Sequence, residues 1–235
     1  GNYMLAGDID AGDTKNWNSG RGFDPIGRLN RTGNGVTGSF SGAFDGICHS
    51  IQNLYIRQIG NQYDGYIGLF EGIGKGGSVG NVNMAGGHIE GTSNFGSIAG
   101  LNWGTIYNIV NSAELVCSSG GVGGIVGTNG GVIRNAVNNG TLKIDGRSGG
   151  ITGYNGDTVW GNTGILLDVK NNGDITSESM GGIGGITGIN SSGSSITGAE
   201  NTGLVELKDG GGSEVGGISG DNDGLIENVK NSGNI

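Results

Sequence analysis

The sequence predicts an all-β protein, a right-handed parallel β-helix of about seven coils with 27 to 33 residues in each coil. Glycine makes up 57 of the 235 residues, with a single proline, against ~7% glycine in an average protein. A short template of glycine, isoleucine and asparagine recurs along the chain. Its apolar segments are only three to five residues long and rich in β-branched residues. These features favour stacked strands over the paired helices of a helical solenoid.

The repeat is clearest in two copies that align without a gap, GIVGTNGGVIRNAVNNGTL and GISGDNDGLIENVKNSGNI. A fixed period of this length is the sequence signature of a solenoid in which each repeat is one coil. Two of the copies carry an insertion after their first six residues. The copies lie at 42–54, 68–82, 97–115, 124–142, from 150, from 185 and at 217–235.

Three strands are expected in each coil. In the copy at 124–142 and its flanks they are GGIVG, VIRNAV and TLKI, taken in chain order. Glycine and asparagine separate them, as expected of turns where a positive φ has little steric cost. Coils stacked at ~4.8 Å would bring like positions into register, so that seven coils form a rod of roughly 34 Å.

Four rows of like positions follow from the alignment. The first is an inward aliphatic ladder with spacings of 28, 27, 27, 33, 30 and 30 residues: Ile51, Val79, Ile106, Ile133, Leu166, Ile196 and Ile226. A second apolar row lies three residues later: Leu54, Val82, Ile109, Ala136, Val169, Ala199 and Val229. A polar turn position lies between them: Asn53, Asn81, Asn108, Asn135, Asp168, Gly198 and Asn228. The fourth row is predicted to form a ladder of side-chain amide hydrogen bonds: Asn111, Asn138, Asn171, Asn201 and Asn231.

The domain organisation is predicted to be continuous. Residues 1–39 depart from the template and are expected to form the first coil or a cap, because terminal repeats must cover the open end of a solenoid. Residues 40–235 are the repeats of the same domain. Residues 216–235 form a plain internal repeat, so the natural protein is expected to continue beyond Ile235.

Composition excludes several classes of protein. The formal charge is -9 with no basic stripe, which argues against nucleic acid as a partner. No apolar run approaches the ~20 residues of a membrane-spanning helix, so no span is expected in this segment. Two cysteines cannot form a disulfide framework. Of these, Cys117 falls where other copies have Ile144 and Leu207, and is expected to be a buried apolar residue.

Candidate site residues are few, and no catalytic residues are predicted. The segment DIDAGD superficially resembles a calcium loop formed by Asp8, Asp10 and Asp13, but no acid closes it as in an EF-hand. We favour a solvated strand in which Asp8 and Asp10 share one face and Ile9 points inward, with a calcium site as the alternative. No other metal or cofactor is expected.

The two insertions are better candidates for binding residues than these aspartates, because loops that project from a rigid solenoid often contain its binding residues. The insertion near 157–164 places Tyr154 and Trp160 as candidate ligand-binding residues, where an exposed tryptophan could stack on a sugar or fill a pocket of a partner. An equal alternative is that Trp160 folds back over the surface of the coil. His49 is expected to be a structural or solvent-facing turn residue.

A resemblance to a known group supports this interpretation. The segments YMLAGDIDA, GFDPIG and FSGAFDGICHSIQNLYI, followed by GGIxGxN units, resemble the GLUG-repeat regions of large secreted bacterial surface proteins. These include filamentous-haemagglutinin-like adhesins and the non-catalytic parts of IgA-cleaving metallopeptidases. Members of the group usually read FDGNGH where this chain has Ile47 and Cys48 at the two central positions. The resemblance implies a bacterial surface location and adhesion, and no catalytic residues.

The expected function is therefore that of a non-enzymatic extracellular segment of a bacterial surface protein, in adhesion or as a rigid stalk that displays a binding region. Its partners would be a host or bacterial surface protein or glycan, or further copies of itself. One alternative is a structural subunit of an extracellular fibre that assembles end to end. Another is a carbohydrate-active β-helix enzyme, although the acids of the repeats form no persistent pair in neighbouring coils.

Overall fold

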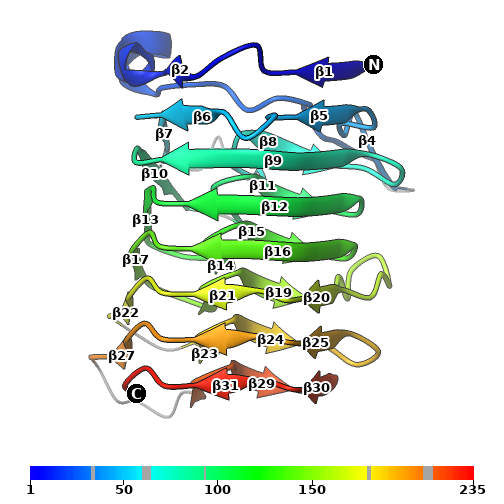
Figure 1. Ribbon diagram of the computed structural model, residues 1–235, viewed down its shortest axis with the longest axis vertical. Helices are drawn as coiled ribbons and strands as arrows, with labels where there is room; N and C mark the ends of the chain where they lie inside the picture. The colour runs from blue at the N-terminus through cyan, green and yellow to red at the C-terminus, as the bar shows by residue number, and fades with distance from the viewer. Residues whose placement is uncertain (33–34, 60–64, 93, 179–180, 209–213) are drawn as a thin grey trace.

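The computed structural model describes the chain apart from residues 33–34, 60–64, 93, 179–180 and 209–213. Almost all of its regular structure is parallel β-sheet, with the strands stacked coil upon coil from one end of the molecule to the other (Figure 1). In Figure 1 the front strands run leftward and those behind run rightward as the chain descends, so the coil is right-handed. The predicted parallel β-helix is confirmed, with about six regular turns below an irregular first coil.

Each regular coil passes through up to four sheets, named here in the order in which the chain meets them. The first sheet is the front face of Figure 1 and has 13 strands. Its strands are β1 (Asn2–Met4), β2 (Ile9–Asp10), β5 (Ala43–Asp45), β6 (Ser50–Gln52), β9 (Ser78–Ala85), β12 (Thr105–Asn111), β16 (Val132–Asn138), β20 (Ile165–Leu167), β21 (Lys170–Asn171), β25 (Ser195–Thr197), β26 (Glu200–Asn201), β30 (Leu225–Glu227) and β31 (Lys230–Asn231).

The other three sheets close the coil. The second consists of β7 (Tyr55–Gln58), β10 (His88–Gly91), β13 (Glu114–Cys117), β17 (Leu142–Ile144), β22 (Ile175–Ser177) and β27 (Val205–Leu207). The third, which the sequence did not predict, consists of β14 (Val122–Gly123), β18 (Ser148–Gly149), β23 (Ile183–Gly184) and β28 (Val215–Gly216). The fourth consists of β8 (Phe70–Ile73), β11 (Ala99–Asn102), β15 (Val126–Asn129), β19 (Thr152–Asn155), β24 (Thr187–Asn190) and β29 (Ser219–Asn222).

The first 40 residues follow the path of a coil with little regular structure. After β2 comes a 3-10 segment, η1 (Gly12–Gly20). Single bridges then join Gly22 to Ile56, Ile26 to Phe70 and Phe40 to Ile73. An antiparallel pair, β3 (Asn30–Thr32) and β4 (Gly35–Thr37), projects from this segment.

The inward ladder of the first sheet has the predicted register over most of the molecule. Val79, Ile106, Ile133, Leu166, Ile196 and Ile226 are successive register partners, and all but Ile226 are fully buried. The polar turn row also lies where expected, and its members have positive φ values: Asn81, Asn108, Asn135, Asp168, Gly198 and Asn228. A narrow interior filled by aliphatic side chains accounts for the low aromatic content of the chain.

The predicted register is wrong in the second coil. The residue paired with Val79 is Phe44, seven positions before Ile51, and Ile51 pairs instead with Met84. The front strand breaks after Asp45, at the same register position as after Leu167, but four residues separate β5 from β6 whereas two separate β20 from β21. Asn53 and Leu54 are displaced with Ile51 from the rows to which the alignment assigned them.

Close contact between coils explains one row of the abundant glycines. A Cβ built on Gly173 would overlap the carbonyl oxygen of Gly140 in the preceding coil, and Gly203 and Gly233 repeat this contact with Gly173 and Gly203. Each of these glycines lies two residues after an asparagine of the predicted amide ladder. The N-x-G pattern therefore marks a corner where one backbone lies directly against the next.

Candidate functional site

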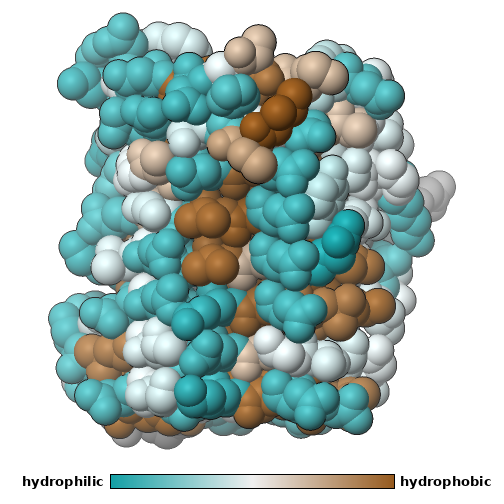
Figure 2. Space-filling view, in the orientation of Figure 1, coloured by the Kyte–Doolittle hydropathy of each residue, from teal (hydrophilic) through white to brown (hydrophobic). Residues whose placement is uncertain are grey.

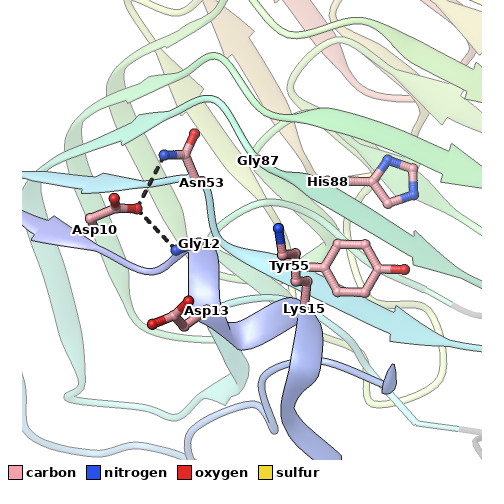
Figure 3. Close-up of a pocket in the computed structure, with 8 residues that line it drawn as sticks. All are labelled: Asp10, Gly12, Asp13, Lys15, Asn53, Tyr55, Gly87 and His88. Carbon is pink, nitrogen blue, oxygen red and sulfur yellow. Dashed lines mark hydrogen bonds between the residues drawn. The ribbon is translucent and has the colours of Figure 1, made fainter. Parts of the chain in front are cut away.

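A pocket of about 450 Å³ lies beside the first coils and is the candidate site of the molecule. It lies between η1, the segment that joins β6 to β7, and the start of β10 (Figure 3). Asp10, Asp13 and Lys15 come from the N-terminal segment, and the neighbouring coils supply the rest. The side chains of Asn53, Tyr55 and His88 complete the lining, together with backbone at Gly12 and Gly87.

One side of the pocket is polar. The Asp10 carboxylate accepts hydrogen bonds from the side-chain amide of Asn53 at 3.1 Å and from the backbone N–H of Gly12 at 3.0 Å. These two donors, the amide first, lower the pKa of Asp10 below its usual value. Asp13 lies in the first turn of η1 and is exposed to solvent. Figure 3 shows Asp10 and Asp13 on the same side of the pocket.

The other side is aromatic. Tyr55 and His88 are register partners on β7 and β10, so their side chains project from neighbouring coils in the same direction. Their rings stack with centroids 5.6 Å apart and planes 21° apart. The Lys15 side chain reaches toward the space between the two sides, as Figure 3 shows.

Carboxylates of the second sheet hold the His88 ring. Its Nδ1 lies 3.1 Å from Oε2 of Glu114, and its Nε2 lies 3.7 Å from Oε2 of Glu90. Glu90 also accepts a hydrogen bond from Nε of Arg57 at 2.8 Å, and Glu114 pairs with Lys143 at 2.7 Å. This network fixes the orientation of the ring that stacks on Tyr55.

Of the three aspartates considered for calcium, Asp10 and Asp13 line the pocket, whereas Asp8 has other partners. Asp8 accepts a hydrogen bond from the backbone N–H of Ser50 at 2.8 Å and lies 3.2 Å from Nδ1 of His49. Across the residues that the structure describes, no group of three or more His, Cys, Asp or Glu side chains is placed to hold a metal ion. Ile9 is 44% exposed because no coil covers it above β2.

The insertion after β19 forms a compact loop organised by Asp157 (Figure 1). The buried carboxylate of Asp157 accepts hydrogen bonds from the backbone N–H groups of Val159 and Trp160 and from Nε1 of Trp103 at 2.8 Å. Trp160 packs edge-on against Trp103, with centroids 6.3 Å apart, and is 36% exposed. Tyr154 lies instead over Gly121. The structure thus separates the two candidate binding residues and makes Val159, 77% exposed, the most prominent apolar side chain of the loop.

Both cysteines are free thiols in different environments. Cys117 is buried, as expected, and burial raises the pKa of its thiol to about 12. Cys48 is exposed at the turn between β5 and β6.

Two asparagine ladders run through the last five coils of the solenoid, and every member but the last of each ladder is buried. The predicted residues hydrogen-bond in chain order at 2.8 Å in each step: Asn111, Asn138, Asn171, Asn201 and Asn231. A second ladder, not recognised from the sequence, has steps of 2.7 to 3.0 Å: Asn102, Asn129, Asn155, Asn190 and Asn222. Its signal was the final asparagine of each GGIxGxN unit, which recurs as regularly as the first row.

Comparison with known proteins gives one partial similarity. Over 111 residues, 47% of this chain, the sequence is 35% identical to Halomucin of Haloquadratum walsbyi. The matched part covers about 1% of the length of Halomucin. No family model matches the chain, and no solved structure matches it. Among the described residues no helix combines the length and the apolar composition needed to cross a membrane.

Proposed function

We propose that this chain is a non-enzymatic, rigid segment of a large extracellular surface protein and that it takes part in adhesion. The observation that carries the proposal is the repeated coil itself, in which two buried amide ladders and a continuous aliphatic interior run through successive coils. Such an array is stiff and can be lengthened by adding coils without changing the fold. The similarity to part of Halomucin and the resemblance to GLUG-repeat regions of bacterial adhesins support the same function.

The location is tested with antibodies raised against the purified 235-residue chain. Intact cells of the source organism should be labelled, and protease treatment of the intact cells should remove the label. Labelling that appears only after the cells are permeabilised would refute an extracellular location.

Adhesion is tested with beads that carry the chain. We expect the exposed loop after β19 to supply the contact, because Asp157 holds Val159 and Trp160 in one conformation before any partner binds. Beads carrying Val159→Ser and Trp160→Ala should lose binding to bacterial or host cells that the native chain binds. Tyr3→Ala, an exposed aromatic at the N-terminal end, is the matched control and should bind as before. Absence of binding by the native chain would contradict an adhesive role. The role of a rigid stalk that displays a binding region would then be the remaining one.

A further inference from the structure

We propose that the pocket between η1 and the starts of β7 and β10 binds a neutral sugar residue. Nothing in the proposed adhesive or structural function requires this site, so the inference goes beyond it. The pocket combines a two-ring aromatic surface, formed by Tyr55 and His88, with a polar side formed by Asp10, Asp13 and Asn53. A sugar ring has the complementary pair of surfaces, since its C–H groups form an apolar face and its hydroxyls lie around the edge.

The polar groups match hydroxyls better than they match a charged ligand. A hydroxyl both donates and accepts, and here the carboxylates of Asp10 and Asp13 accept while the ammonium of Lys15 donates. Within the described part of the chain, Asp13 and Lys15 form no hydrogen bond or ion pair through their side chains, so their hydrogen-bonding capacity is available to a ligand. One oxygen of Asp10 is held by Asn53 and Gly12, which fixes the direction of the carboxylate.

The orientation of the aromatic side is fixed in advance. Tyr55 and His88 belong to adjacent strands in register, and Glu114 and Glu90 flank the two nitrogens of the His88 ring. The stacked pair is therefore held in one arrangement, so little entropy is lost when a ligand binds against it.

Asp10 and Asp13 oppose a phosphate or a uronate. They outnumber the single ammonium of Lys15, so charge alone does not separate a neutral sugar from an organic cation, and choline is the probe that does. The chain as a whole carries a charge of -9, which also opposes anionic ligands.

Saturation-transfer NMR on the intact chain tests the assignment. The probes are methyl glycosides of glucose, galactose, mannose and N-acetylglucosamine at about 10 mM, which detects dissociation constants in the millimolar range. Glucuronate, choline and methyl phosphate, which also carry C–H protons, are measured in parallel. Saturation transfer to the C–H protons of at least one neutral glycoside is expected, with little or none to the three charged probes.

Two variants locate the site. Tyr55→Ala removes half of the aromatic surface and should weaken binding about fivefold to tenfold, the range expected for loss of one aromatic contact. Asp13→Asn keeps the size of an exposed side chain, removes its charge and should weaken binding about fivefold. Tyr3→Ala and Asp223→Asn, exposed residues outside the pocket, are the matched controls and should leave binding unchanged.

Circular dichroism and thermal unfolding show whether each variant is folded, and Asp13→Asn provides the test if Tyr55→Ala is not. Transfer to none of the neutral glycosides overturns the proposal. So does preferential binding of choline, glucuronate or methyl phosphate, or neutral-glycoside binding that Asp13→Asn leaves unchanged. None of these results depends on where the chain is located or on whether it adheres to cells. The sugar site can therefore be refuted while the adhesive function stands, and the adhesive function can be refuted while the sugar site stands.

Discussion

Three residues, Ser148, Ile47 and Cys48, depart from the pattern of the repeats. Ser148 lies in the inward row of the third sheet, where its register partners are Val122 and Ile183. Its hydroxyl is fully buried and is the one buried side-chain oxygen or nitrogen without a hydrogen-bond partner among the described residues. Ile47 and Cys48 have φ values of 49° and 61°, a region in which side chains with a Cβ are strained. Both features cost stability for no gain that the fold requires.

Ser148→Ala should raise the free energy of unfolding by about 1 kcal/mol, because it removes a buried polar group that has no partner. Urea unfolding followed by circular dichroism measures the change. Ser97→Ala is the matched control, since Ser97 is equally buried but donates a 2.6 Å hydrogen bond to the carbonyl of Gly124. That control should lower stability by a similar amount, and an equal loss in both variants would contradict the argument.

The turn between β5 and β6 does not carry the residues that its backbone conformation favours. The backbone N–H of His49 bonds to the carbonyl of Gly46 at 2.8 Å across two residues of positive φ, which is the pattern of a type I′ turn. Asn-Gly is the preferred pair there. Ile47→Asn with Cys48→Gly should therefore raise the free energy of unfolding by about 1–3 kcal/mol, measured by urea unfolding. Cys48→Ala is the control, because it removes the thiol but keeps the Cβ, and a gain as large as that of the double variant would exclude strain as the cause.

At the scale of the strand and the coil, polar ladders contribute to fixing the register. Asn171 shows the complete pattern of a buried member. Its amide donates to the carbonyl of Gly173 and to Oδ1 of Asn201, both at 2.8 Å, and its own Oδ1 accepts from Asn138. A slip of one residue would turn these side chains outward and leave the corner carbonyls without donors. The ladders thus contribute specificity as well as stability, in an interior that is otherwise aliphatic.

Asn171→Ala should lower the free energy of unfolding by about 2–4 kcal/mol, because it leaves buried groups in two neighbouring coils without partners. Asn231→Ala is the matched control at the end of the same ladder, where the residue is exposed and water can replace the lost bonds. It should cost about 1 kcal/mol or less. Urea unfolding of the two variants measures the difference. Equal losses of stability would show that burial does not increase the contribution of a ladder residue.

The limits of sequence-based prediction also lie at this scale. From Val79 onward, glycine corners and asparagine rows repeat closely enough to place each strand against the next. In the second coil, Phe44 and Ile51 are both inward residues of short strands, so hydrophobic alternation does not distinguish them. Matching isoleucine to isoleucine selected the wrong one. The pocket was missed because Tyr55 and His88 are 33 residues apart and meet only through this register.

At the scale of the whole molecule, stability should vary from coil to coil. Each coil contacts only its neighbours, so an end coil can open by breaking one interface while a central coil must break two. The burial of the inward rows follows this expectation. Ile106, Ile133 and Leu166 have no exposed surface, whereas Ile226 in the last coil is half-buried. In Figure 2 many of the apolar side chains on the front face lie along its middle, with mostly polar side chains on either side.

Hydrogen exchange measured by mass spectrometry should therefore show a gradient of protection along the first sheet. Amides of β12 and β16 should exchange most slowly, and protection should fall through β20–β21 and β25–β26 to β30–β31, because opening from the end breaks the fewest contacts. Two matched substitutions separate local from global opening. Ile226→Ala should accelerate exchange in β30 and β31 alone, whereas Ile133→Ala, in a fully buried site where such a change costs about 2–5 kcal/mol, should accelerate it in several coils on both sides. Equal protection in all coils, or equal effects of the two substitutions, would show that the solenoid unfolds as a single cooperative unit.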